Sequence, residues 1–316
     1  MYQSDFTKQL FEKCAFPADA CAYLTACEER ICASPVLDGI LSDAVSGYMT
    51  DKPTDLSAWL DRLSEAAPQF DLHPYTMHLL FALRCMPILH GRYLVDARLT
   101  EEMFWEHAVD LRCKLNECIE CKGIVGSFVA PWFAGMFDMT RVALGRFQYV
   151  LRTYTAEPFV TPMGYTMNAG DPYVEFHIPS TGVPLTDDVR MDSYRRAYRF
   201  YRDAFPADKP VVLATSTWLL YPEHRKFLPP HSNLLRFLDD FHIAFSSENP
   251  AFSNAWRLFG ASAERDPADW YDDTSLRRAY KNYILSGGVA GSGWGFMFMQ
   301  NEQNITHQPA EKQLCQ

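Results

Sequence analysis

Two titratable side chains, Glu175 and His177, stand two residues apart in the apolar segment 173–178. If this segment is a strand, alternation places both on one face and the apolar residues on the other. Either group can take a proton from an amine, which is protonated near neutral pH and needs a base before it can attack. His177 titrates in the useful range without tuning. The structural alternative, with His177 bonded to backbone and Glu175 paired with an arginine, stays open.

The segment that follows is suited to hold an anion. Residues 179–185 form a short loop, and a helix is predicted from Thr186. The first N–H groups of a helix have no internal partner, and Gly182 lets backbone approach a phosphate closely. Asp187 and Asp188 would repel a diphosphate at this helix end, an effect that Arg190 would offset. A self-capped helix without a ligand is an equal alternative.

The surrounding pattern predicts alternating strands and helices. We expect strands at 146–152, 173–178, 211–220 and 242–245, because these runs are apolar or alternate in polarity. Helices are expected from 186, at 232–240 and at 273–285, where apolar residues recur at helical spacing. The glycine-rich run 287–295 is not read as a nucleotide loop, because no strand precedes it and no helix follows.

The first 120 or so residues read as helices joined by short breaks. Thr54 is expected to cap one helix, and Pro74 opens another that Pro87 should kink or end. Thr100, followed by two glutamates, begins the clearest helix. Catalytic residue types do not gather in this part, so a helical bundle is the simplest interpretation.

Composition narrows the function classes. The 316 residues are 48% hydrophobic and 22% charged, and the net charge is -10. An acidic chain lacks the basic face that nucleic-acid binding needs. No apolar run is long enough for a membrane span, and the first residues do not resemble a signal peptide. We therefore expect a cytoplasmic globular protein that binds neither nucleic acid nor a membrane.

The nine cysteines are scattered, and Cys118 and Cys121 lie i, i+3 on one predicted helix face. They could share a metal, but no second pair or histidine follows at zinc-site spacing. Reduced, packed thiols are the favoured interpretation, and no metal is expected.

Five motifs in order resemble one bacterial family of acyltransferases with a helical N-terminal domain and a GNAT-like C-terminal domain. They are Leu144-Gly145-Arg146-Phe147-Gln148-Tyr149, His177-Ile178-Pro179-Ser180 with Gly182 and Pro184-Leu185-Thr186, Trp218-Leu219-Leu220, Leu228-Pro229 with Ser232 to Phe237, and Asp273 to Ala279. Each motif alone is weak, and their order makes the resemblance fairly specific.

The resemblance implies an α+β fold, with an all-helical N-terminal bundle at 1–122, a mixed sheet flanked by helices at 123–300 and a polar tail at 301–316. In GNAT-like folds the fourth and fifth strands separate, and an acyl-CoA lies between them as co-substrate. Those strands would be 173–178 and 211–217. The implied coenzyme A ligands are Ile178, Thr181, Gly182, Val183, Leu185, Thr186, Arg190 and Thr215.

The same resemblance implies N-acyl transfer to the amine of a small molecule or peptide, with Glu175 or His177 as base and Tyr221 as the acid for the leaving thiolate. No cysteine falls on the two strands, so direct transfer is favoured over a covalent acyl-enzyme. The alternative is a GNAT-like ligand-binding or regulatory module without catalysis. A homo-oligomer stays open.

Overall fold

The computed structural model describes residues 4–50 and 55–310. Its contacts divide the chain into two compact units. A helical unit comprises residues up to Ala143 together with Pro179–Thr181, and a sheet unit comprises Leu144–Ile178 and the chain from Gly182 onward. The sequence predicted a boundary between two domains at residue 122, and that domain boundary stays a prediction. The structure confirms the α+β class, because helices fill the first unit and a mixed sheet forms the second.

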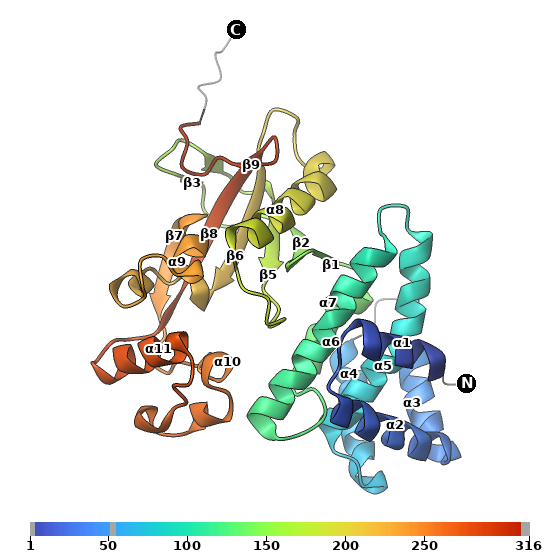
Figure 1. Ribbon diagram of the computed structural model, residues 1–316. Helices are drawn as coiled ribbons and strands as arrows, with labels where there is room; N and C mark the ends of the chain where they lie inside the picture. The colour runs from blue at the N-terminus through green and yellow to red at the C-terminus, as the bar shows by residue number, and fades with distance from the viewer. Residues whose placement is uncertain (1–3, 51–54, 311–316) are drawn as a thin grey trace. The chain divides into compact units, whose positions relative to one another are not determined.

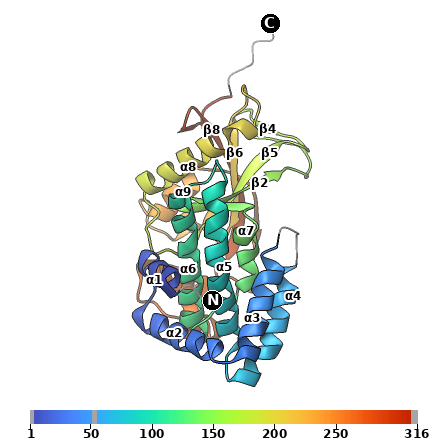
Figure 2. The same cartoon turned by 90° about the vertical axis from the view of Figure 1, so that its right-hand side faces the viewer.

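The helical unit is built from amphipathic helices. Its elements are α1 (Ser4–Lys13), α2 (Ala18–Cys32), α3 (Pro35–Tyr48), α4 (Leu56–Ala66), η1 (Ala67–Phe70), α5 (Pro74–Val95), α6 (Glu101–Lys122), η2 (Ala130–Phe133) and α7 (Ala134–Phe137). The longest, α5 and α6, run side by side (Figure 2). Thr100 caps α6 as predicted, accepting a hydrogen bond from the Met103 backbone N–H. Asp55 caps α4, whereas Thr54 lies outside the described residues. Helix α5 continues through Pro87, so of the two predicted effects of this proline the end of the helix is wrong, and a kink stays a prediction.

One largely buried arginine, Arg84, bonds to side chains of two other helices. The Arg84 Nε of α5 donates to Glu28 of α2 at 2.8 Å, and its Nη1 donates to Asp38 of α3 at 2.8 Å. Because Glu28 is only 2% exposed, its charge requires this partner. The cluster fixes how the helices pack and involves no loop or cleft.

The sheet has the strand order β1-β2-β5-β6-β8-β7, with β9 added to β8, and of β1 only Leu144 is counted in the sheet unit. The strands are β1 (Arg141–Leu144), β2 (Phe147–Thr153), β5 (Pro172–His177), β6 (Val211–Thr217), β7 (His242–Glu248), β8 (Gly291–Gln300) and β9 (Gln303–Asn304), and β3 (Phe159–Val160) and β4 (Thr166–Met167) form a separate hairpin. Strands β5 and β6 run parallel, and β5 with β2, β6 with β8 and β7 with β8 run antiparallel. Residues 218–220, predicted as strand, form a 3-10 turn instead.

The helices of the sheet unit include α8 (Asp187–Tyr201), α9 (Asn233–Asp239), α10 (Trp256–Phe259) and α11 (Ser275–Leu285), with short turns η3 (Arg202–Ala204), η4 (Trp218–Leu220), η5 (Pro222–Lys226), η6 (Gly260–Glu264) and η7 (Pro267–Asp269). Helices α8 and α9 cover one face of the sheet (Figure 1), where Phe176 packs against Tyr194 and Phe237. The β3–β4 hairpin covers part of the other face, where Phe159 packs against Phe296. We call these the helix face and the hairpin face.

The glycine-rich run of the sequence begins an internal strand, β8, which the sequence analysis missed. A side chain at Gly293 would overlap the carbonyl oxygen of Leu220, and one at Gly291 would overlap the ring of Tyr221. Glycine is therefore required because the chain after β6 crosses directly over β8. Because glycine is more typical of loops than of strands, the sequence pattern did not predict a strand here.

Candidate functional site

Strands β5 and β6 pair over a short length only. Their parallel register joins Val174 with Leu213 and Glu175 with Ala214. The printed register ends at these two pairs, whereas β6 pairs with β8 along its whole length from Val211 to Thr217. A gap between the carboxyl ends of β5 and β6 stays a prediction.

Glu175 and His177 share the hairpin face at this gap. Val174 and Phe176 are fully buried on the helix face, whereas Glu175 and His177 are half-buried on the other. The alternation predicted from the sequence is thus present. Glu175 accepts a hydrogen bond from the Arg152 Nε at 3.0 Å. The sequence analysis gave pairing with an arginine as the alternative to a catalytic role for Glu175. The pair is present, and the Glu175 side chain is still partly exposed.

Gln148 is a candidate site residue that was not predicted from the sequence. It lies directly opposite His177 in the β2–β5 register and therefore on the same face. Its side chain is 1% exposed, and neither Oε1 nor Nε2 bonds any described residue. A buried amide without partners is costly, which is typical of a group kept for a ligand. The only sequence signal was its place in the Leu144–Tyr149 motif.

The predicted anion loop is held by its carbonyl groups. In the sheet unit, Arg146 Nε donates to the Val183 oxygen at 3.1 Å, and Arg190 Nη1 donates to the Leu185 oxygen at 2.6 Å. Gly182 adopts φ +84°, and a side chain there would meet open space. The glycine is thus needed for its backbone conformation, and the space beside it is available to a ligand.

The first part of the same loop belongs to the helical unit. Ser180 Oγ donates to Glu117 at 2.5 Å, and Arg112 donates to the Thr181 oxygen at 3.3 Å. Ile178, half-buried, ends the preceding segment in the sheet unit. Among the predicted coenzyme A ligands, Thr181 is therefore held by α6, whereas Gly182 onward is held by the sheet unit.

Arg190 is fixed within α8 and not extended toward solvent. Its side chain is nearly fully buried, its Nε donates to Asp240 at 2.7 Å, and its Nη2 donates to Asp187 at 3.0 Å. The paired carboxylates keep the pKa of Arg190 above its ordinary value despite the cost of burial. Direct contact of Arg190 with a phosphate stays a prediction, and the geometry makes it the residue that positions the loop at Leu185.

The two acidic residues at the start of α8, Asp187 and Asp188, already have hydrogen-bond or ion-pair partners in the protein. Asp187 also pairs with Arg236 at 3.0 Å, so two guanidinium groups face its carboxylate. Hydrogen bonds from the Thr186 hydroxyl and the Val189 backbone lower the pKa of Asp188. Two arginines thus neutralise Asp187, whereas Asp188 accepts hydrogen bonds from the first turn of α8. Whether a ligand binds at this helix end stays open.

Thr215 does not share a face with the proposed base, and Tyr221 lies beyond the end of β6. Thr215 is 2% exposed and alternates with Ala214, which puts it on the helix face. Tyr221 follows the η4 turn and does not end β6; burial raises its pKa, so it holds its proton at neutral pH. Their roles as ligand and acid stay predictions.

A buried His–Tyr pair next to Tyr221 was not predicted. His224 Nε2 and the Tyr280 hydroxyl lie 2.5 Å apart, and both side chains are fully buried. Burial lowers the pKa of His224 to about 4. The pair sits among aromatic rings, including Trp218 and Phe227, and no sequence spacing connects residues so far apart.

The described part of the chain contains no cluster of side chains suited to bind a metal ion. Cys118 is buried, and burial raises its pKa to about 11, which disfavours the thiolate that binds metal. No three His, Cys, Asp or Glu side chains gather there as metal ligands. Among those residues no helix has the length and apolarity to span a bilayer.

Two family models match consecutive parts of the chain. Residues 5–139 match the N-acyltransferase N-terminal domain, and residues 142–297 match the GNAT-like C-terminal domain. No curated protein matches the chain in sequence.

Solved structures share the fold along nearly the whole chain. An acyltransferase in complex with decanoyl-CoA and teicoplanin is 19% identical, with a TM-score of 0.69 over 95% of this chain and 90% of that one. A mutant acyltransferase in complex with octanoyl-CoA is 18% identical, with a TM-score of 0.67 over 95% and 90%. An acyltransferase in complex with CoA and 10C-teicoplanin is 17% identical, with a TM-score of 0.61 over 93% and 99%. The two family models leave only the ends of the chain and residues 140–141 unmatched, and the protein belongs to the acyltransferase family that joins an N-acyltransferase N-terminal domain to a GNAT-like C-terminal domain.

Proposed function

We propose that this protein transfers an acyl group from an acyl-CoA thioester to an amine by direct attack. The observation that carries the proposal is the short pairing of β5 with β6, whose register ends at Glu175, with His177 on the same face two residues later. Membership of an acyltransferase family supports the same reaction.

The loop after β5 fits a coenzyme A diphosphate. Gly182, Val183, Leu185 and Thr186 would supply backbone N–H groups, and the open space beside Gly182 admits a phosphate. The carbonyl groups of Val183 and Leu185 are engaged by arginines, so their negative ends are satisfied by cations. Arg236 and Arg190 offset the charge of Asp187.

In the proposed chemical step, the amine nitrogen attacks the thioester carbonyl carbon. His177 takes the proton that the amine loses, directly or through water, and Glu175 stabilises the positive charge that develops near it. The buried Gln148 amide would bind the acyl carbonyl or the amine opposite His177. The C–N bond forms, the C–S bond breaks, and Tyr221 or water returns a proton to the thiolate.

The donor and acceptor are proposed by class. The structural neighbours are complexes with decanoyl-CoA, octanoyl-CoA or CoA, so medium-chain acyl-CoA is the first donor to test. The acceptor is the amine of a small molecule or a peptide; two of those complexes contain teicoplanin or its 10C form. A cytoplasmic location and a homo-oligomer stay predictions.

The test is calorimetric titration with acetyl-, octanoyl- and decanoyl-CoA, followed by a free-thiol assay with a panel of primary amines. We expect acyl-CoA binding and amine-dependent CoA release. The Gly182→Val variant should bind acyl-CoA at least tenfold more weakly, because φ +84° strains any branched residue. Binding without release for every amine would favour the non-catalytic module, and the absence of binding would refute both.

A further inference from the structure

Arginines bind alternate carbonyl oxygens along the predicted anion loop. The three bonds, in chain order of the carbonyls, are Arg112 to Thr181 at 3.3 Å, Arg146 to Val183 at 3.1 Å and Arg190 to Leu185 at 2.6 Å. The first pair lies within the helical unit, and the other two lie within the sheet unit. Each guanidinium holds an oxygen, so the negative ends of these peptide groups face cations of the protein.

Each of these bonds also fixes the direction of a peptide group. A trans peptide is planar, so its C=O and N–H point in opposite directions. No peptide bond in the described ranges is cis. An arginine that binds the Thr181 oxygen therefore turns the N–H of Gly182 to the opposite side. An arginine that binds the Leu185 oxygen does the same for the N–H of Thr186.

The two N–H groups turned in this way are available to a ligand. The N–H groups of Gly182 and Thr186 bond no described residue, whereas the Thr181 N–H is donated to the Pro179 oxygen at 2.9 Å. A side chain at Gly182 would meet open space, so the backbone there can be approached closely. A hydrogen bond at the carbonyl end polarises the peptide, which makes the N–H at its other end a stronger donor for an anion.

The middle arginine provides an internal comparison. The peptide that carries the Val183 oxygen continues into Pro184, which has no N–H. Arg146 therefore holds the loop by a bond of similar length to that of Arg112, but it orients no donor. If the arginines served only to fix the loop, the two would be equivalent. If they direct donors toward an anion, Arg112 matters more.

Arg112 is suited to direct a donor because it has no competing partner. Its only bond within the part of the chain that the structure describes is the one to Thr181, and its Nε is buried without a partner there. Another residue of α6, Glu117, also contacts the loop by accepting a hydrogen bond from Ser180 at 2.5 Å. Lys114 lies 3.0 Å from that carboxylate and neutralises it. The charge of Arg112 is therefore directed at the Thr181 carbonyl.

We infer that Arg112 is a positioning residue for coenzyme A: by holding the Thr181 oxygen, it directs the Gly182 N–H toward the diphosphate of the co-substrate. The inference rests on the proposed acyl-CoA-dependent transfer. It gives a residue of the helical unit a part in binding, although the predicted ligands all lie on the strands, the loop and α8. Arg112 acts through the peptide group and does not contact the phosphate itself.

The first experiment compares Arg112→Met with Arg146→Met by calorimetric titration of octanoyl-CoA. Methionine keeps an unbranched stem and removes every donor. We expect Arg112→Met to weaken binding about tenfold and Arg146→Met less than about threefold, because only the first peptide carries an N–H. Arg112→Lys should recover most of the affinity, since an ammonium can still donate to the Thr181 oxygen. Equal losses for the two methionine variants overturn the inference.

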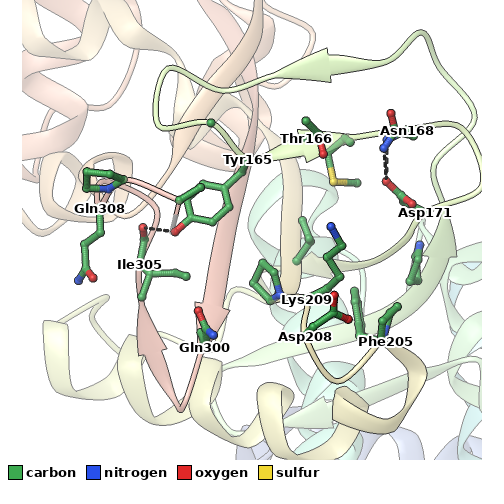
Figure 3. A pocket seen from close by; sticks show the side chains of 18 residues that line it. Tyr165, Thr166, Asn168, Asp171, Phe205, Asp208, Lys209, Gln300, Ile305 and Gln308 are labelled. Carbon is green, nitrogen blue, oxygen red and sulfur yellow. Dashed lines mark hydrogen bonds between the residues drawn. The ribbon is translucent and has the colours of Figure 1, made fainter. Parts of the chain in front are cut away.

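The control for the loss of one positive charge is Lys209→Gln. Lys209 lines a cavity of about 670 Å³ near the start of β6 (Figure 3). Because β5 and β6 are parallel, this end of β6 is opposite to the end of β5 from which the loop leaves. We expect Lys209→Gln to change the affinity for octanoyl-CoA by less than about twofold. A loss as large as that of Arg112→Met would indicate general attraction of an anion, or binding in the cavity, and would overturn the inference.

A ligand series tests which phosphate is involved. Octanoyl-dephospho-CoA keeps the diphosphate and lacks the 3′-phosphate, whereas octanoyl-pantetheine lacks all phosphates. Arg112→Met should weaken the binding of the first about tenfold and leave the binding of the second unchanged. A loss that persists with octanoyl-pantetheine would indicate damage to the fold, and a loss that requires the 3′-phosphate would assign the effect to another group. Either result contradicts the inference.

The second experiment observes the Gly182 N–H in the unaltered protein, so it does not depend on the folding of an arginine variant. Protein labelled with ¹⁵N-glycine is titrated with octanoyl-CoA, and the Gly182 signal is the one that Gly182→Ala removes. We expect its amide proton to shift downfield with octanoyl-CoA and not with octanoyl-pantetheine. Binding of octanoyl-CoA without this shift overturns the inference and leaves the proposed function intact. No binding of any acyl-CoA refutes the proposed function, and the inference with it.

Discussion

Two histidines lie after or at the ends of the neighbouring strands β5 and β6, and their surroundings are opposite. His177 is the last residue of β5, and His224 lies in the turn η5 that follows β6. His177 is half-buried on a polar face with Glu175 beside it and Gln148 opposite. His224 is fully buried among aromatic rings and is bonded to Tyr280. The comparison teaches that residue type and position near a strand end are not enough. Exposure decides which histidine can exchange a proton with a substrate and which contributes to stability alone.

The largest effect should come from His177→Ala. We expect kcat with octanoyl-CoA and an amine to fall by about 10² to 10⁴, the usual contribution of a general base, with little change in melting temperature. His224→Ala should lower the melting temperature of the protein and leave the kcat of the folded fraction unchanged. A His177→Ala enzyme with full activity, measured by CoA release, would end the proposed distinction between the two residues.

The second effect concerns pH and stability. His224 has a pKa of about 4 in the folded protein and about 6.5 when unfolded, so the unfolded chain binds its proton first as pH falls. The stability contributed by the neutral ring is present above pH 6.5 and is lost toward pH 4, about 3 kcal/mol in all. Urea unfolding at several pH values measures this loss.

The matched control for this loss is the double variant His224→Phe/Tyr280→Phe, which removes both polar partners together. Its stability should fall less steeply between pH 6.5 and 4 than that of the unaltered protein. The pKa values of His78, His107 and His242 are also lowered by burial, and they contribute equally to both proteins. Parallel pH profiles would show that the environment assigned to His224 is wrong.

Gln148→Leu should separate stability from activity at the first histidine. Removing a buried amide that bonds no described residue is expected to stabilise the fold by about 1 kcal/mol, since its desolvation cost disappears. If the amide serves a substrate, kcat/KM should fall about tenfold at the same time. A Gln148→Leu protein that is less stable and equally active would assign Gln148 to packing.

Glu175→Gln tests how much the neighbouring charge helps His177. The neutral amide can still accept a hydrogen bond from Arg152, so stability should change by less than about 1 kcal/mol. We expect kcat to fall about tenfold, a smaller loss than for His177→Ala. A larger loss for Glu175→Gln than for His177→Ala would make Glu175 the base, and the pH–rate profile of each variant will identify which group titrates.

The smallest effect is expected for Tyr221→Phe. The Tyr221 side chain is nearly buried, and its ring packs beside His224 at 6.0 Å. It thus belongs more to the surroundings of the second histidine than to those of the first. We expect kcat to change by less than about threefold. A loss of a hundredfold or more would restore it as the acid that protonates the thiolate.

Local pattern predicted what depends on neighbours in the chain. Alternation over residues 173–178 correctly placed Glu175 and His177 on one face, and the pattern around Thr186 correctly gave the loop and helix α8. The α+β class and the family followed from ordered motifs. These features can be read from the sequence because a strand or helix repeats its pattern of buried and exposed side chains with a fixed period along the chain.

Features that depend on distant partners were not predicted. The bond from Arg190 to Asp240, fifty residues later in the chain, could not be read from the sequence, whereas contact of Arg190 with a phosphate stays a prediction. Tyr280 lies 56 residues from His224, and no spacing in the chain relates them. Strand β8 was hidden because close crossing by Leu220 demands glycine, a residue that favours loops elsewhere.

The short register between β5 and β6 has a mechanical consequence. Only two residue pairs join the β1-β2-β5 half of the sheet to the β6-β8-β7 half. The two halves must then be held mainly by side chains, such as Phe176 against Phe237 and Phe241 and the Arg190–Asp240 pair. Rings can slide where backbone hydrogen bonds cannot, so the sheet should resist twisting less at this seam than between its other paired strands.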